Sequence, residues 1–303
     1  MEQQNKIEPR KKYPPKIDII FQAIFGEVGS EHITKDFLEK ILNRKIEKIS
    51  LDKNPILRRE LKEDKLGVLD IMTELDGKEK CNIEIQLSDK SNIIERVLYY
   101  WSRIYAKQLK AGNYYDKLEK TIVILIADFN IKGLEKLSYH SVWKIMETDN
   151  AKKLILTDKF EVDIIELRKI EGKEKEKDQL LDWLMFLENP ESERVTQKMK
   201  ENENLKEAVE KLNKINEDEK MQRIIELREK AIRDEHAIYT KGIEDEKVQI
   251  AKNMLKENIS IDIIIKVTRL TKEEVEKLVW YFSYPIKWNI KIWLKQKAFC
   301  DIL

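Results

Sequence analysis

The sequence has few of the residues that build zinc sites, disulfide scaffolds or membrane spans. Its two cysteines, Cys81 and Cys300, lie far apart, and its three histidines are scattered, which argues against a zinc site made of cysteine and histidine. No run of about eighteen uncharged apolar residues occurs, so we expect no transmembrane helix and no membrane partner. Together these absences favour a reduced, cytoplasmic setting.

An excess of charge of one sign is also missing. Charged residues make up 38% of the 303-residue chain, but 58 lysines and arginines nearly balance 57 acidic residues, and the formal net charge is only +1. Bulk charge therefore does not identify a polyanion-binding protein. Any affinity for nucleic acid must come from a local patch.

Hydrophobic periodicity predicts an α/β core over residues 13–170. Helical spacing of apolar residues predicts two short helices over 18–43 and a longer helix over 89–110. The apolar run at 121–128 is typical of a central strand that is covered on both faces. Further strand candidates are 141–148 and 162–167.

After this core the composition shifts to glutamate, lysine and asparagine. We expect a charged helical connector over 171–246, because no heptad pattern lasts long enough for a coiled coil. Short helices joined by a tight turn predict a small helix-turn-helix-like unit over 247–280, a motif that is more often a packing unit than a DNA-binding one. Residues 281–303 form an atypical basic and aromatic tail, to which we assign no function.

Two short strand-like segments each carry a carboxylate in the middle, namely Asp70 in the first and Glu84 in the second. Asp76-Gly77 between them is a strong hairpin signal, which predicts that the two acids lie on adjacent strands. Alternation along the second strand places Glu84 and Gln86 on one face. Two carboxylates and an amide oxygen suit Mg²⁺, so the pattern predicts a magnesium site. The ordinary alternative is that both acids face solvent or pair with lysines.

Several short motifs occur in a distinctive order: Asp18-x-x-Phe21-x-x-x-Phe25-Gly26, Leu69-Asp70-Ile71, Asn82-Ile83-Glu84-Ile85-Gln86 and Arg96-x-x-x-Tyr100-x-x-x-x-Tyr105. This order resembles the PD-(D/E)XK nuclease superfamily. Over residues 13–130 the chain is most similar to the recombination-promoting nucleases (the Rpn family), which are also labelled putative transposases. The segment 250–274 is similar to the usual ending of that family.

The resemblance implies a restriction-endonuclease-like α/β core, in which helices flank a mixed central sheet, followed by a helical C-terminal extension. It implies a DNA endonuclease that acts in recombination, depends on Mg²⁺ or Mn²⁺ and hydrolyses phosphodiester bonds. Asp70 and Glu84 would be catalytic metal ligands, and Asp18 would be a further acidic ligand or a group that supports the ligands. Gln86 would take the catalytic position that is lysine in the superfamily.

Glutamine at position 86 carries no charge, so activation of water would depend on the metal or on another residue. Lys90 and Arg96 are the candidates, and both are also expected to contact DNA. Two other functions stay open. One is a catalytically inactive DNA-binding relative, and the other is a protein-interaction module that forms homo-oligomers through its helical C-terminal half.

Overall fold

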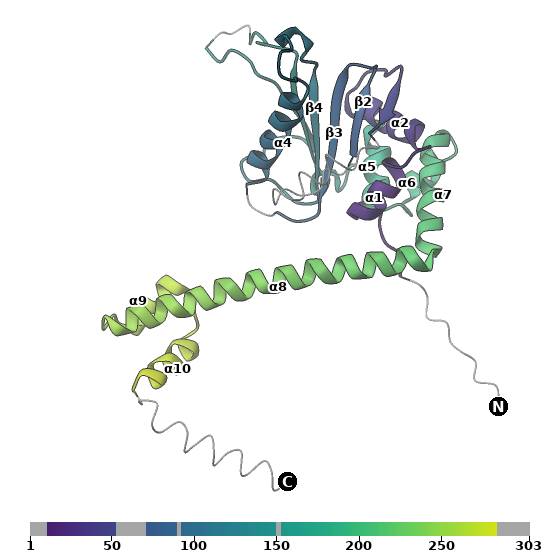
Figure 1. The fold of residues 1–303 in the computed structure, drawn as a ribbon. Coiled ribbons are helices and arrows are strands. Elements are labelled where there is room, and N and C mark those ends of the chain that lie inside the picture. The colour runs from purple at the N-terminus through teal and green to yellow at the C-terminus, as the bar shows by residue number, and fades with distance from the viewer. Residues whose placement is uncertain (1–10, 53–70, 90–91, 150–152, 284–303) are drawn as a thin grey trace, which may run out of the picture. The chain divides into compact units, whose positions relative to one another are not determined.

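The computed structural model describes residues 11–52, 71–89, 92–149 and 153–283 (Figure 1). Asp70 and Lys90 are therefore outside the described residues. The contacts divide the chain into two units, Met1–Gln222 and Arg223–Leu303.

The described part of the first unit opens with the two short helices predicted over 18–43. They are α1 (Asp18–Phe25) and α2 (Glu31–Ile41), and each turns a row of apolar side chains toward the core. Gly26 follows α1 directly, and a Cβ there would lie only 2.9 Å from the carbonyl oxygen of Gln22. A larger residue would therefore need the backbone to shift at this turn.

The predicted hairpin is also present. Strand β2 (Ile71–Leu75) pairs antiparallel with β3 (Glu79–Gln86), and β1 (Ile49–Leu51) pairs antiparallel with β2. Between β2 and β3, Asp76 and Gly77 both have positive φ, at 54° and 70°, as a type I′ turn requires.

The remaining strands complete a six-stranded sheet in the order β1-β2-β3-β4-β6-β5. Strand β4 (Thr121–Ala127) lies parallel to both β3 and β6 (Phe160–Glu166), and every residue of β4 is buried, as its apolar run predicts. Strand β5 (His140–Trp143) pairs antiparallel with β6 and is shorter than the predicted 141–148, because beyond it only an isolated bridge joins Met146 to Ile155. The predicted mixed sheet is thus confirmed.

Helices cover both faces of this sheet (Figure 1). Helix α4 (Ile93–Lys107) covers one face and is shorter than the predicted 89–110, since Asn92 precedes it in a left-handed conformation with φ 56°. The other face is covered by α1, α2 and α5 (Leu180–Glu188). Two short 3-10 helices span Tyr115–Lys117 and Leu167–Ile170.

Helix α5 joins α1 and α2 through a cluster of aromatic rings. Trp183 lies with its ring centroid 5.7 Å from that of Phe25 and 5.6 Å from that of Phe37, and its Nε1 donates to Asp36 Oδ2 at 2.9 Å. Helices α6 (Glu193–Lys198) and α7 (Glu203–Glu217) follow, and α7 contacts α1 and α2. The domain boundaries predicted above stay predictions, but the structure adds that α5 and α7 pack on the helices next to the sheet.

In the second unit the end of α8 (Glu219–Lys256) packs with α9 (Ile261–Thr268) and α10 (Lys272–Ser283). Their shared core consists of Ala251, Ile264, Leu270 and Val275. Thr271 and Glu274 cap α10 reciprocally, with Glu274 Oε2 accepting from the Thr271 backbone and Thr271 Oγ1 accepting from the Glu274 backbone.

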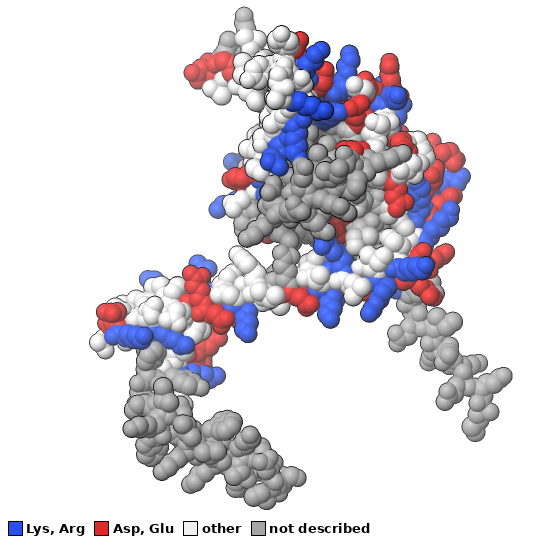
Figure 2. Space-filling model, in the orientation of Figure 1, with Lys and Arg blue, Asp and Glu red and all other residues white. Residues whose placement is uncertain are grey.

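Charges of both signs are mixed over the surface of the described residues. On the face drawn in Figure 2, lysines and arginines are interspersed with aspartates and glutamates, as the balanced composition leads one to expect. Among the helices that the structure describes, none is long and apolar enough to cross a membrane.

Candidate active site

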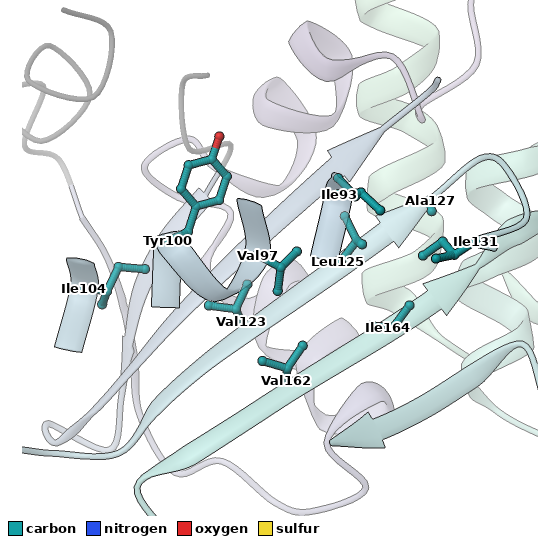
Figure 3. Close-up of a cluster of buried hydrophobic side chains, with 10 residues drawn as sticks. All are labelled: Ile93, Val97, Tyr100, Ile104, Val123, Leu125, Ala127, Ile131, Val162 and Ile164. Atoms are coloured by element: carbon teal, nitrogen blue, oxygen red, sulfur yellow. The ribbon is translucent and has the colours of Figure 1, made fainter. Parts of the chain in front are cut away.

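The face of the sheet beneath helix α4 combines an apolar cluster with a row of polar side chains on β3. Helix α4 packs on this face through a buried cluster that it forms with β4 and β6 (Figure 3). Asn82, Glu84 and Gln86 share the face, because they are in register with the residues of β4 that belong to this cluster. The predicted alternation of β3 is therefore present, with Glu84 and Gln86 on the side of α4.

Glu84 lies at the centre of this row and receives two hydrogen bonds on one oxygen. Gln86 Nε2 donates to Glu84 Oε1 at 2.9 Å, and an Arg96 Nη donates to the same oxygen at 3.2 Å. The same nitrogen of Arg96 lies 3.2 Å from the Tyr100 hydroxyl, and its guanidinium lies 5.8 Å from the centre of the Tyr100 ring. Because Arg96 and Tyr100 are one turn apart on α4, the helix fixes the position of the guanidinium against Glu84.

Burial dominates the electrostatics of Glu84. The residue is 1% exposed, and burial raises the pKa of its carboxyl from 4.5 to about 7, although Arg96 and the amides of Gln86 and Asn82 act in the opposite direction. Its second oxygen, Oε2, has no hydrogen-bond partner among the described residues. A buried carboxylate oxygen without a partner is costly, so this position favours a ligand that supplies positive charge.

Three of the predicted site residues lie together in the structure. Glu84, Gln86 and Arg96 are in direct contact, so Arg96 pairs with an acid of the site, and its contact with DNA stays a prediction. Asp18 is the first residue of α1, and its Oδ1 accepts from the Ile19 backbone at 2.9 Å. Its role as a metal ligand stays a prediction, as do the roles of Asp70 and Lys90.

Asn82 is a further residue of the polar row that was not predicted from the sequence. This side chain is fully buried, stands beside Glu84 on the same face of β3, and neither end of its amide completes a hydrogen bond among the described residues. The alternation that selected Glu84 and Gln86 also includes position 82, so the signal was present in the sequence.

A second missed group lies where β3 and β4 end. The Asp128 backbone donates to the Gln86 carbonyl at 2.9 Å, and the Asp128 carboxylate forms ion pairs with Lys16 at 2.8 Å and Arg168 at 2.9 Å. Lys16 also pairs with Glu188 of α5 at 2.7 Å. These charges neutralise each other at the carboxyl ends of two parallel strands, next to the end of the polar row.

The polar row offers hard oxygen ligands but is not by itself a complete metal site. Within the described residues no three histidine, cysteine, aspartate or glutamate side chains gather closely enough to hold a metal. Glu84 contributes one carboxylate, and Asn82 and Gln86 add amide oxygens on the same face. Ligands of this kind suit Mg²⁺ or Mn²⁺ better than softer metals.

Comparison with known families gives one result for this chain. A family model described as PD-(D/E)XK nuclease family transposase matches residues 15–242, which include the whole sheet and helices α1, α2 and α4 to α7. No match was found among curated proteins or solved structures.

Proposed function

Because the chain belongs to the PD-(D/E)XK nuclease family transposases, we propose that it is a DNA endonuclease that depends on a divalent metal. The observation that supports this most strongly is the carboxylate of Glu84. It is buried, its pKa is raised to about 7, and one of its oxygens has no hydrogen-bond partner among the described residues. Perturbed acids of this kind concentrate at functional sites.

The residues of the polar row fit a hard divalent cation. In the proposal Glu84 and Asp70 hold Mg²⁺ or Mn²⁺, and Asp18 is a further candidate ligand. Glu84 contributes through Oε2, which is unpartnered among the described residues, while Oε1 stays bonded to Gln86 and Arg96. A metal bound there would lower the pKa of a bound water and offset the negative charge on the phosphate oxygens.

Gln86 and Arg96 divide the work that one lysine does in the superfamily. Gln86 donates to Glu84 and fixes the orientation of its carboxylate, but it brings no charge. Arg96 supplies the positive charge, 3.2 Å from the same oxygen, and favours the ionised form of Glu84 before a metal binds. Glutamine at position 86 is therefore compatible with activity.

Plasmid nicking tests the proposal directly. Purified full-length protein is incubated with supercoiled plasmid and Mg²⁺ or Mn²⁺, with EDTA as the blank. We expect Glu84→Gln and Asp70→Asn each to slow nicking by roughly a thousandfold, because several kcal/mol of metal-dependent stabilisation is lost. The matched control is Glu74→Gln, which alters an acid of the same sheet that forms an ion pair with Lys80.

Two results would contradict the proposal. A native protein that binds DNA in a salt-sensitive way, but never cuts it with either metal, would be an inactive DNA-binding relative. Equal nicking by the native protein and both site variants would place the active site elsewhere. Circular dichroism of each variant shows whether a loss of activity comes from unfolding.

A further inference from the structure

The middle of helix α8 (Figure 1) carries large apolar side chains that no described residue covers. Between residues 226 and 246, every residue whose side chain the structure describes is exposed, apart from the half-buried Glu229. Five large hydrophobic residues of this segment are between 39% and 74% exposed, namely Leu227, Ile232, Ile238, Tyr239 and Ile243. Most helical stability in proteins comes from packing of an apolar face, so this segment lacks the contact that such a face normally makes.

The five side chains share one side of the helix. When the chain is wound at 3.6 residues per turn, all of them fall within about 160° of the helix circumference. The opposite side of the same segment carries charged residues, among them Glu226, Lys230 and Arg233. The middle of α8 is therefore amphipathic, which is typical of a helix that packs on another element.

The neighbouring helices of this unit do not cover the apolar side. At the end of α8, Val248, Ala251 and Leu255 pack with α9 and α10. Ile250 lies two turns after Ile243 on the apolar side and is still 40% exposed. Helices α9 and α10 thus pack on a different side of α8 and leave its apolar side exposed.

The charges of α8 are segregated along its length. Residues 220–233, the basic segment, contain five cations and two acids, whereas residues 234–246, the acidic segment, contain one cation and five acids. Both acids of the basic segment form ion pairs within the helix, Glu226 with Arg223 at 3.4 Å and Glu229 with Arg233 at 3.6 Å. Exposed pairs of this kind are weak, so the two segments keep opposite electrostatic character.

A second copy of the chain complements both features. When two α8 helices run antiparallel, the basic segment of each lies beside the acidic segment of the other, and a net charge of +3 faces one of −4. When they run parallel, like segments lie side by side and repel each other. A two-fold axis produces the antiparallel arrangement with the same surface on both copies, as a closed dimer requires.

We infer that the middle of α8 forms an antiparallel pair with α8 of a second copy of this chain. The apolar sides of residues 226–246 pack against each other, and the basic and acidic segments face each other at both ends of the contact. At 1.5 Å per residue the contact is roughly 30 Å long, so it needs no sustained heptad pattern. The inference does not depend on the proposed nuclease activity.

Analytical ultracentrifugation of the full-length protein, from about 1 to 100 µM, tests the association. We expect a reversible dimer whose mass approaches twice the 36.2 kDa of the chain. Ile232→Gln and Ile243→Gln should each raise the dissociation constant at least about tenfold, because each removes apolar area from both halves of the contact. The matched control is Ile145→Gln, because Ile145 is 41% exposed, against 39% for the other two, and lies outside α8.

Charge reversal tests the direction of the two helices. The triple variant Glu244→Lys/Asp245→Lys/Glu246→Lys makes the acidic segment basic, so in the antiparallel pair two basic segments then meet. We expect the dissociation constant to rise about tenfold. In a parallel pair the same variant would remove the repulsion between two acidic segments and would tighten the dimer.

A compensating variant separates charge from misfolding. Adding Arg228→Glu/Lys230→Glu/Arg233→Glu to the triple variant reverses both segments in one chain, so opposite charges meet again and the native affinity should return. Circular dichroism of each variant shows whether its helices are retained.

Three results would overturn the inference. One is a monomer of 36.2 kDa over the whole concentration range, which would assign the apolar side of α8 to a different partner. The second is an equal loss of affinity with Ile145→Gln and with the two variants of α8, which would place the contact elsewhere. The third is a tighter dimer in the triple charge variant, which would show that the helices run parallel.

Discussion

Glu84 and Asp163 are two buried acids of one sheet. Comparing them separates the effect of burial on a carboxylate from the effect of the side chain that is paired with it. Each is 1% exposed, in each burial raises the pKa, and each has one oxygen without a hydrogen-bond partner among the described residues. They lie on opposite faces, Glu84 beneath α4 and Asp163 at the floor of a polar cavity.

The partners of the two acids differ in kind. Glu84 is paired with Arg96, which stays charged at any pH that the protein tolerates, whereas Asp163 is paired with His140, whose ring can be neutral or charged. A permanent cation favours the ionised form of Glu84, although burial still raises the pKa of this carboxyl. A histidine instead matches the charge of Asp163 only when it is protonated. Burial alone therefore does not identify a catalytic acid.

The largest effect on stability is expected from removing Arg96, the permanent cation beside Glu84. We expect Arg96→Met to lower the free energy of unfolding at pH 8 by about 4 kcal/mol, because it leaves the buried Glu84 without its charged partner. At pH 5 the loss should be much smaller, since Glu84 is then protonated in the folded protein. Urea unfolding in EDTA at both pH values measures the difference.

The double variant Glu84→Gln/Arg96→Met is the control for this prediction. It removes the buried charge together with its partner, so it should recover most of the stability that Arg96→Met loses. An equal loss at pH 5 and pH 8 would show that Arg96 acts through packing against Tyr100.

The raised pKa of Glu84 should make the free energy of unfolding depend on pH. Folding raises the pKa of Glu84 from 4.5 to about 7, so between these values the folded protein holds a proton that the unfolded chain has released. The contribution of Glu84 to stability is therefore complete below pH 4.5 and is lost as the pH rises through 7, by up to about 3 kcal/mol.

Glu84→Gln removes this titration, so the variant should gain stability relative to the native protein as the pH rises from 4.5 to 8. Urea midpoints at several pH values in EDTA give this difference directly. A constant difference across the range would mean that folding does not raise the pKa of Glu84. Asp163→Asn should change the slope in the same direction, since burial also raises the pKa of Asp163.

The smallest effect concerns the histidine partner. We expect His140→Leu to lower the free energy of unfolding by about 2 kcal/mol, because Asp163 then loses its hydrogen bond in a buried position. His140→Gln retains a donor and should cost clearly less. Metal-dependent nicking should stay within a few fold of the native rate in both variants. A large loss would show that His140 and Asp163 contribute to the same activity as Glu84, on the opposite face of the sheet.

The parts of the fold that local patterns control were predicted well. The Asp76-Gly77 turn, the buried strand β4 and the alternation of β3 all follow from nearest neighbours along the chain, and all are present. The contact between Gln86 and Glu84 belongs to this group, because the two residues lie on one face of one strand.

Contacts between distant elements were not predicted. The contact of Arg96 with DNA stays a prediction, and its pairing with Glu84 depends on how α4 lies on β3. The pair of His140 and Asp163 depends on β5 returning antiparallel beside β6, which no local pattern specifies. Helix α5 had a readable signal, since seven of its nine residues are hydrophobic and buried, but it falls in the region 171–246, for which the composition predicts a charged connector.

The aromatic contact between α2 and α5 also has a consequence for synthesis on the ribosome. Trp183 and Asp36, which are hydrogen-bonded, are 147 residues apart, so α1 and α2 are made long before the helix that covers them. At about 5–20 residues per second the gap lasts roughly seven to thirty seconds. During that interval Phe25 and Phe37 of the nascent chain lack their Trp183 cover, so the first helices to be made are among the last parts of the core to close.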